Sequence, residues 1–82
     1  MRITIYSTTT CPFCEMLKNF LDEKNLKYSE KLVDQDAGAK DEMITKSDGY
    51  LGVPFTVITK DSGEEVKIVG FDKNLLSQTL GV

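Results

Sequence analysis

Apolar and polar residues alternate at the start of the chain and then change to a helical spacing. In "RITIYS", residues 2–7, Ile3 and Ile5 share one face, which is the period of a strand. A helix is expected over residues 12–24, and Asn25 suits its end. Its apolar residues recur at helical spacing and would form a stripe that faces a core: Phe13, Met16, Leu17, Phe20 and Leu21.

The middle of the chain predicts a second strand and a second helix. Residues 27–33 have the composition of a strand. Either Asp34 or Asp36 can cap a helix that runs to about Ser47, and Gly49 fits the end of that helix. The expected apolar face of this helix is weak and consists of Ala37, Met43 and Ile44.

The last third predicts a hairpin and a short helix. Residues 54–59 and 64–69 are expected to be antiparallel strands joined by the turn sequence "KDSG". Asp72 can cap a last helix, which carries Leu75, Leu76 and Leu80. The predicted order is β-α-β-α-β-β-α in one domain over residues 1–82, and the first β-α-β unit is long enough for a right-handed parallel crossover.

Composition excludes several classes of function. A chain of 82 residues with a net charge of −3 lacks the basic excess expected for binding nucleic acid or an anionic membrane. No apolar run approaches the ~20 residues of a membrane span. The absence of histidine removes Ser-His and Cys-His catalytic schemes, and with only two cysteines it also removes a closed zinc site within one chain.

Two cysteines are too few for a secreted disulfide scaffold, so a reducing cytoplasm is the expected compartment. Met1 and Arg2 lead directly into a strand-like run, and no signal peptide is expected. We expect a monomer that binds no metal and no organic cofactor.

The candidate chemistry lies in "TTTCPFC", residues 8–14. If Pro12 takes the first helical position, Cys11 becomes the N-cap residue, where backbone amides and the helix dipole favour a thiolate. A free thiol has a pKa of ~8.5, and helix N-termini and C-x-x-C motifs lower it to ~3.5–7.5. Cys14 aligns with Leu17 and Leu21, so it is expected to be more buried than Cys11.

This asymmetry suits a two-step exchange, in which Cys11 attacks a disulfide and Cys14 resolves the mixed disulfide. The pair also allows three other interpretations. A staple that closes a loop of about four residues would give only roughly 2 kcal/mol. A metal or iron–sulfur carrier would need the two thiolates of a second chain, and the cysteines could also be inert. C-P-x-C at a strand-to-helix junction favours the redox pair.

A second motif, "GVP" at residues 52–54, precedes a predicted strand. Proline at the first position of a strand is ordinary. The functional interpretation is a cis Val53–Pro54 bond that turns the backbone of Val53 toward an extended substrate.

The segments "YSTTTCPFC", "GVPF" and "VGFD" together resemble the glutaredoxins, within the thioredoxin-fold superfamily, and the resemblance covers nearly the whole chain. It implies an α/β, thioredoxin-like fold with a four-stranded mixed sheet flanked by three helices. It also implies Cys11 as nucleophile, Cys14 as resolving thiol and Pro54 in cis. The residues that would contact a substrate or glutathione are Thr10, Pro12, Phe13, Val53, Pro54, Gly70, Phe71 and Asp72.

The chain departs from the family pattern around glutathione, which is an expected co-substrate. No basic residue occupies positions 7–10, and Tyr50 and Gly52 stand where a polar side chain and a threonine are common. The family's Gly-Gly-x-Asp appears only as Val-Gly-Phe-Asp, residues 69–72. Gly-Phe at 70–71 resembles redoxins fed by thioredoxin reductase. The expected partners are disulfide-containing proteins and either glutathione or a thioredoxin reductase as donor.

Several candidates also have plain structural interpretations. Phe13 can be an exposed contact or part of the core. Asp72 can be a helix cap or a ligand contact. Tyr6 and Tyr50 can line a cleft or simply pack.

Overall fold

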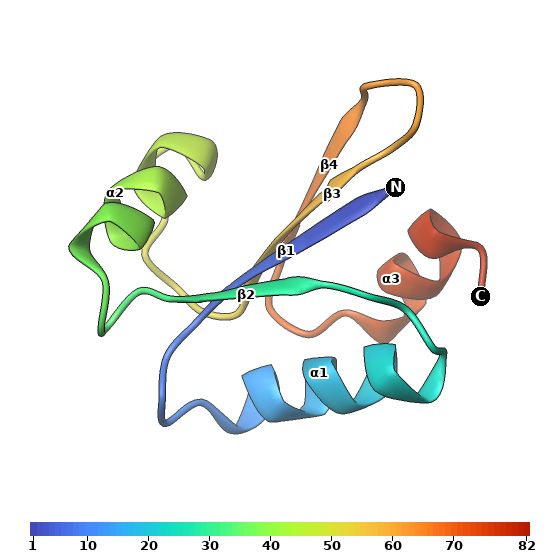
Figure 1. The fold of residues 1–82 in the computed structure, drawn as a ribbon, viewed down its shortest axis with the longest axis horizontal. Helices are drawn as coiled ribbons and strands as arrows, with labels where there is room; N and C mark the ends of the chain where they lie inside the picture. The colour runs from blue at the N-terminus through green and yellow to red at the C-terminus, as the bar shows by residue number, and fades with distance from the viewer.

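Four strands and three helices follow one another as β-α-β-α-β-β-α in the computed structural model, which describes residues 1–82 (Figure 1). This order confirms the sequence prediction. The elements are β1 (Arg2–Ser7), α1 (Pro12–Glu23), β2 (Ser29–Leu32), α2 (Ala37–Lys46), β3 (Phe55–Thr59), β4 (Glu65–Val69) and α3 (Lys73–Leu80). Strand β2 is shorter than the expected 27–33.

The strands form one mixed sheet in the order β2-β1-β3-β4, with β1 and β2 parallel and the other two pairs antiparallel. The predicted thioredoxin-like arrangement is confirmed. Tyr6 pairs with Phe55, and Phe55 pairs with Val69. The segments that follow β1, precede β3 and follow β4 therefore all emerge at one end of the sheet.

Helices cover both faces of the sheet. Figure 1 shows α1 and α3 on one side and α2 on the other. The α1/α3 side holds a cluster of eight buried apolar residues: Ile3, Ile5, Leu17, Phe20, Leu21, Ile58, Ile68 and Leu76. The α2 side holds a smaller cluster formed by Tyr6, Met43, Phe55 and Val57. Burial in both clusters supplies the main driving force for folding.

The apolar stripe of α1 is narrower than its sequence predicts. Met16 is 48% exposed, so the expectation that it faces the core is wrong, and Phe13 is 60% exposed, which leaves the exposed one of its two interpretations. The buried face consists of Cys14, Leu17, Phe20 and Leu21. Met16 lies about 100° around the helix from Leu17, and Phe13 lies about 100° around it from Cys14. The end of α1 is as expected, since Asn25 takes a left-handed φ of 57°.

Helix α2 is capped by Asp36, whose Oδ1 accepts hydrogen bonds from the amides of Gly38 and Ala39 at 2.9 and 3.3 Å. Asp34, the other candidate cap, has a different role described below. The buried residues of the helix are Ala39 and Met43. Ala37 is exposed because it is the first residue of the helix, at its tip. None of the three helices combines the length and the apolarity needed to cross a membrane.

Candidate active site

The two cysteines lie at the N-terminus of α1, directly after the loop that leaves β1. Cys11 is the N-cap residue with extended backbone angles (φ −119°, ψ 103°), and Pro12 begins the helix as expected. The Cys11 Sγ accepts a hydrogen bond from the Cys14 amide at 3.1 Å. The two side chains form a disulfide with a Cα–Cα distance of 5.1 Å. The first turn of α1 therefore places a backbone donor on the sulfur of Cys11.

The two sulfur-bearing residues differ in exposure. Cys14 is only 1% exposed, because it points into the buried face of α1 with Leu17. Cys11 is partly exposed, and Pro12 and Phe13 beside it are exposed. A molecule approaching from solvent can therefore reach Cys11 and not Cys14.

The loop before Cys11 is held by a carboxylate from the segment between β2 and α2. Asp34 Oδ2 accepts two hydrogen bonds from Thr9, one from the amide at 3.1 Å and one from the hydroxyl at 2.7 Å. These bonds hold the pKa of Asp34 below its ordinary range. Sequence reasoning missed this contact and considered Asp34 only as a helix cap. Thr10, the next residue, is exposed and directly precedes Cys11.

A second polar network links α1 to the ends of β1 and β2. Glu30 accepts a hydrogen bond from the buried Ser7 hydroxyl at 2.7 Å and an ion-pair contact from Lys18 Nζ at 3.0 Å. Lys18 also pairs with Glu15 at 2.9 Å. Desolvation disfavours the charge of Glu30, but Ser7 and Lys18 outweigh it and lower the pKa of this carboxylate. The network fixes α1, and with it the cysteines, against the sheet.

The segment before β3 has the geometry that the resemblance implied. The Val53–Pro54 peptide bond is cis, Pro54 is buried, and Val53 packs against the cluster on the α2 side of the sheet. The Pro54 carbonyl accepts a hydrogen bond from the Gly70 amide at 2.8 Å. Gly70 has a φ of 74°, a left-handed conformation that favours glycine. This bond ties the loop after β4 to the segment before β3.

Phe71 and Asp72 have clear structural contacts. The Phe71 ring packs edge-on against Phe20 of α1, with ring centroids 6.2 Å apart. Asp72 is the N-cap of α3 and accepts a hydrogen bond from the Leu75 amide at 3.0 Å. Contact of these residues with a ligand stays a prediction.

The two tyrosines considered for the cleft lie in different environments. Tyr6 is 1% exposed and donates a hydrogen bond to Glu42, which also pairs with Lys31. Burial, followed by the bond to Glu42, raises the pKa of Tyr6. Tyr6 therefore belongs to the core. Tyr50 is 40% exposed and lies in the loop before Val53.

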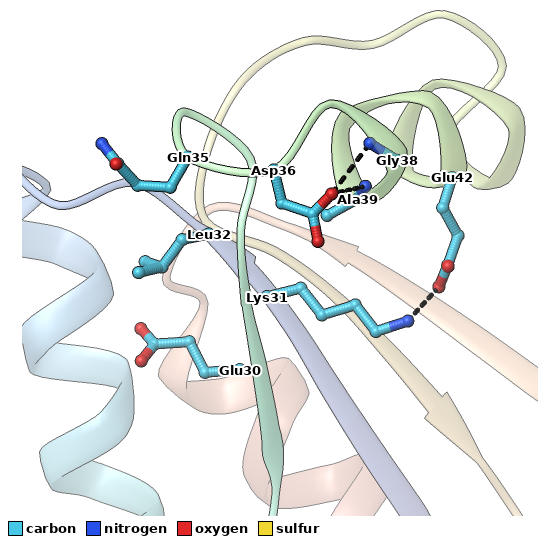
Figure 2. A pocket seen from close by; sticks show the side chains of 8 residues that line it. All are labelled: Glu30, Lys31, Leu32, Gln35, Asp36, Gly38, Ala39 and Glu42. Carbon is cyan, nitrogen blue, oxygen red and sulfur yellow. Dashed lines mark hydrogen bonds and ion pairs between the residues drawn. The ribbon is translucent and has the colours of Figure 1, made fainter.

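The largest cavity, of about 510 Å³, lies between β2 and α2 (Figure 2). Figure 2 shows that two of its polar groups are already engaged, since Lys31 pairs with Glu42 and Asp36 caps α2. Neither cysteine lines this largest cavity. A smaller cavity of about 240 Å³ adjoins the cysteine loop through Thr8, and its other lining residues are Val33, Asp34, Lys40, Met43 and Leu51.

A disulfide within a helix N-terminus, placed after the first strand of a mixed four-stranded sheet, defines a thioredoxin-fold protein with a redox-active dithiol. The Glutaredoxin family model matches residues 3–62. The chain belongs to the glutaredoxin family.

Relatives cover nearly the whole chain. It is 32% identical over 81 residues to an SPbeta prophage-derived thioredoxin-like protein, YosR, of Bacillus subtilis, covering 98% of this chain and 95% of the relative. It is 41% identical over 71 residues to a glutaredoxin-like protein encoded in a rubredoxin operon of Clostridium pasteurianum, covering 87% of each. The crystal structure of the thioredoxin-like protein BC3987 superposes with a TM-score of 0.77 at 35% identity, covering 94% of this chain and 97% of that one.

Proposed function

We propose that this protein is a dithiol thiol–disulfide oxidoreductase that reduces protein disulfides through Cys11 and Cys14. The observation that carries the proposal is the unequal placement of the two cysteines. Cys11 caps α1 at the surface with an amide directed at its sulfur, while Cys14 is 1% exposed. Such a thiol pair has one accessible nucleophile and one internal resolving group.

The reaction consists of two thiol–disulfide exchanges, in which the total numbers of thiols and of electrons stay constant. The Cys11 thiolate attacks one sulfur of the substrate disulfide, a mixed disulfide forms, and the other substrate sulfur leaves as a thiolate that takes up a proton. Cys14 then loses its proton and attacks the Cys11 sulfur, which releases the second substrate thiol. The substrate gains two electrons, and the protein is left with the Cys11–Cys14 disulfide. A dithiol donor, or two molecules of a thiol, reduces that disulfide by the reverse exchanges.

The donor that fits best is an enzyme of the thioredoxin-reductase type. Glutathione carries two carboxylates, and residues 7–10 before Cys11 supply no cation. Lys40 lines the cavity beside Thr8, but Asp34 lines the same cavity and opposes an anion there. Each missing contact to a carboxylate removes about 1.5–3 kcal/mol, or roughly ten- to a hundredfold in affinity. Asp72 and the nearby backbone can still bind glutathione, so we expect glutathione-dependent turnover that is slower than turnover with the thioredoxin reductase.

Coupled turnover tests both the reaction and the donor. NADPH consumption is followed with a protein disulfide and with a glutathione mixed disulfide, using glutathione plus its reductase or a thioredoxin reductase. We expect faster turnover of the protein disulfide with the thioredoxin reductase. Turnover with glutathione alone, at ordinary glutaredoxin rates, would overturn the donor assignment. No turnover with either donor, together with a cluster-bridged dimer after anaerobic purification, would favour a metal carrier.

A further inference from the structure

Tyr50 and Gly52 share one volume in the loop before β3. A Cβ atom built on Gly52 would lie 2.5 Å from Cζ and 2.7 Å from Cε1 of Tyr50, which is closer than real Cβ contacts. The Tyr50 ring therefore occupies the space that a side chain at position 52 would need.

The backbone gives no separate reason for glycine at this position. Gly49, Gly63, Gly70 and Gly81 have positive φ angles, whereas Gly52 does not. A side chain at position 52 would therefore have to displace the ring of Tyr50, but it would meet no demand from the backbone conformation. The two residues thus form one structural unit, in which the small residue makes the position of the large one possible.

The Tyr50 backbone is anchored on the end of α2. The Ser47 hydroxyl donates to the Tyr50 carbonyl at 2.7 Å, and the Tyr50 amide donates to the Ser47 carbonyl at 3.3 Å. Leu51, the next residue, is 59% exposed and lines the same cavity as Thr8 of the cysteine loop. The backbone of Tyr50 is thus fixed three residues before Val53, in a loop whose next residue, Leu51, reaches the cysteine loop.

We propose that Tyr50, seated on Gly52, selects protein disulfides in which an apolar side chain flanks the reacting cysteine. The inference rests on the proposed function, in which an extended segment of the substrate lies along Val53. Side chains on such a segment are spaced by roughly 3.3 Å per residue, and Tyr50 lies three residues before Val53, so the proposal assigns the ring to the side chain next to the reacting cysteine. A half-exposed tyrosine offers a large apolar face at a small cost in conformational entropy, and it carries no positive charge to pair with a carboxylate.

The test compares two peptide disulfides that differ only at the residue flanking the reacting cysteine, which is phenylalanine in one and aspartate in the other. The measured quantity is the ratio of their kcat/KM values. We expect the wild type to prefer the phenylalanine peptide about tenfold, as an aromatic contact of this kind supports. Tyr50→Phe should keep this ratio because it keeps the ring.

Tyr50→Ala should bring the ratio close to one, and so should Gly52→Thr, because the new side chain displaces the ring. The double variant should lose no more than either single variant, since the two residues act as one unit. NMR supplies a readout independent of activity: the Gly52 Hα resonances should be shifted by the ring in the wild type and in Tyr50→Phe. The shift should vanish in Tyr50→Ala.

An unchanged ratio in Tyr50→Ala overturns the inference, and so do additive losses in the double variant. Melting temperatures close to that of the wild type establish that the variants are folded. If the wild type turns over both peptides without preference, only this inference fails. If the wild type reduces neither peptide with any donor, the proposed function fails and the inference fails with it.

Discussion

Asp34 accepts both a backbone and a side-chain hydrogen bond from Thr9, across a sequence separation of 25 residues. This contact joins the loop that leads into Cys11 to the segment between β2 and α2. It restrains the cysteine loop in the absence of regular secondary structure, since residues 8–11 belong to no helix or strand.

Replacing Asp34 by alanine should loosen this loop without disturbing α2. We expect faster hydrogen exchange at the Thr9 amide and a lower kcat/KM on a protein disulfide. Asp36→Ala is the matched control, because it removes a cap of α2 and should lower the melting temperature while leaving Thr9 protected. Equal Thr9 exchange in the wild type and in Asp34→Ala would contradict this role.

The two cysteines should respond differently to substitution by serine. Cys11→Ser should abolish turnover, because a serine hydroxyl without a general base is a poor nucleophile. Cys14→Ser should still attack a substrate disulfide, and the mixed disulfide should accumulate because nothing resolves it. Mass spectrometry of the trapped species measures this difference. In the reduced wild type at about pH 6, Cys11 should react with iodoacetamide much faster than Cys14. Equal rates would refute the assignment of nucleophile and resolving thiol.

Glu30 should make a pH-dependent contribution to stability. Its pKa in the folded protein lies below the usual value of 4.5, despite desolvation, because Ser7 and Lys18 stabilise the anion. The contribution is therefore fully present above that value and is lost as the pH falls through the lower folded-state pKa.

Denaturant unfolding of Glu30→Gln tests this contribution. We expect a loss of about 1 kcal/mol at about pH 7, where solvent screens a partly exposed pair, and a shrinking difference from the wild type toward about pH 3. Glu64→Gln is the control, since its exposed pair with Lys60 at 3.7 Å should contribute little. A difference between wild type and Glu30→Gln that grows on acidification would show the opposite linkage.

Neighbouring positions on α1 should differ sharply in their tolerance of alanine. Leu17 is 0% exposed in the larger cluster, and Leu17→Ala should cost about 2–5 kcal/mol of the free energy of unfolding. Met16 is 48% exposed, so Met16→Ala should change that free energy by no more than about 0.5 kcal/mol. Similar losses at both positions would show that the buried face of α1 is as wide as its sequence suggests.

Much of the fold follows from local patterns in the sequence. The strands and helices are marked by the periodicity of their apolar residues, and Asn25 and Asp36 mark helix ends. Burial of Cys14 follows from its alignment with Leu17 along one helix face. Such features depend on residues that are only a few positions apart in the sequence, so they can be predicted without a structure.

The polar contacts that position the site depend instead on the tertiary fold. Thr9 meets Asp34, and Ser7 meets Glu30, across separations of 25 and 23 residues. No periodicity links residues so far apart, and each side chain is also plausible as a turn or surface residue. The contact between Tyr50 and Gly52 could not be predicted for another reason. A glycine in a sequence does not show which neighbouring side chain fills the space beside it, and only the structure locates the ring there.

The register of the sheet separates two ends of the molecule. Arg2 pairs with Thr59, and Thr59 with Glu65, at the end opposite to the cysteine loop. Strand β1 spans six residues, which places these ends roughly 17 Å apart. Figure 1 shows the first residue of the chain on the far side from the start of α1. A tether attached at residue 1 or at the hairpin turn of residues 60–63 would therefore hold the protein on a bead or electrode with Cys11 directed toward the solution.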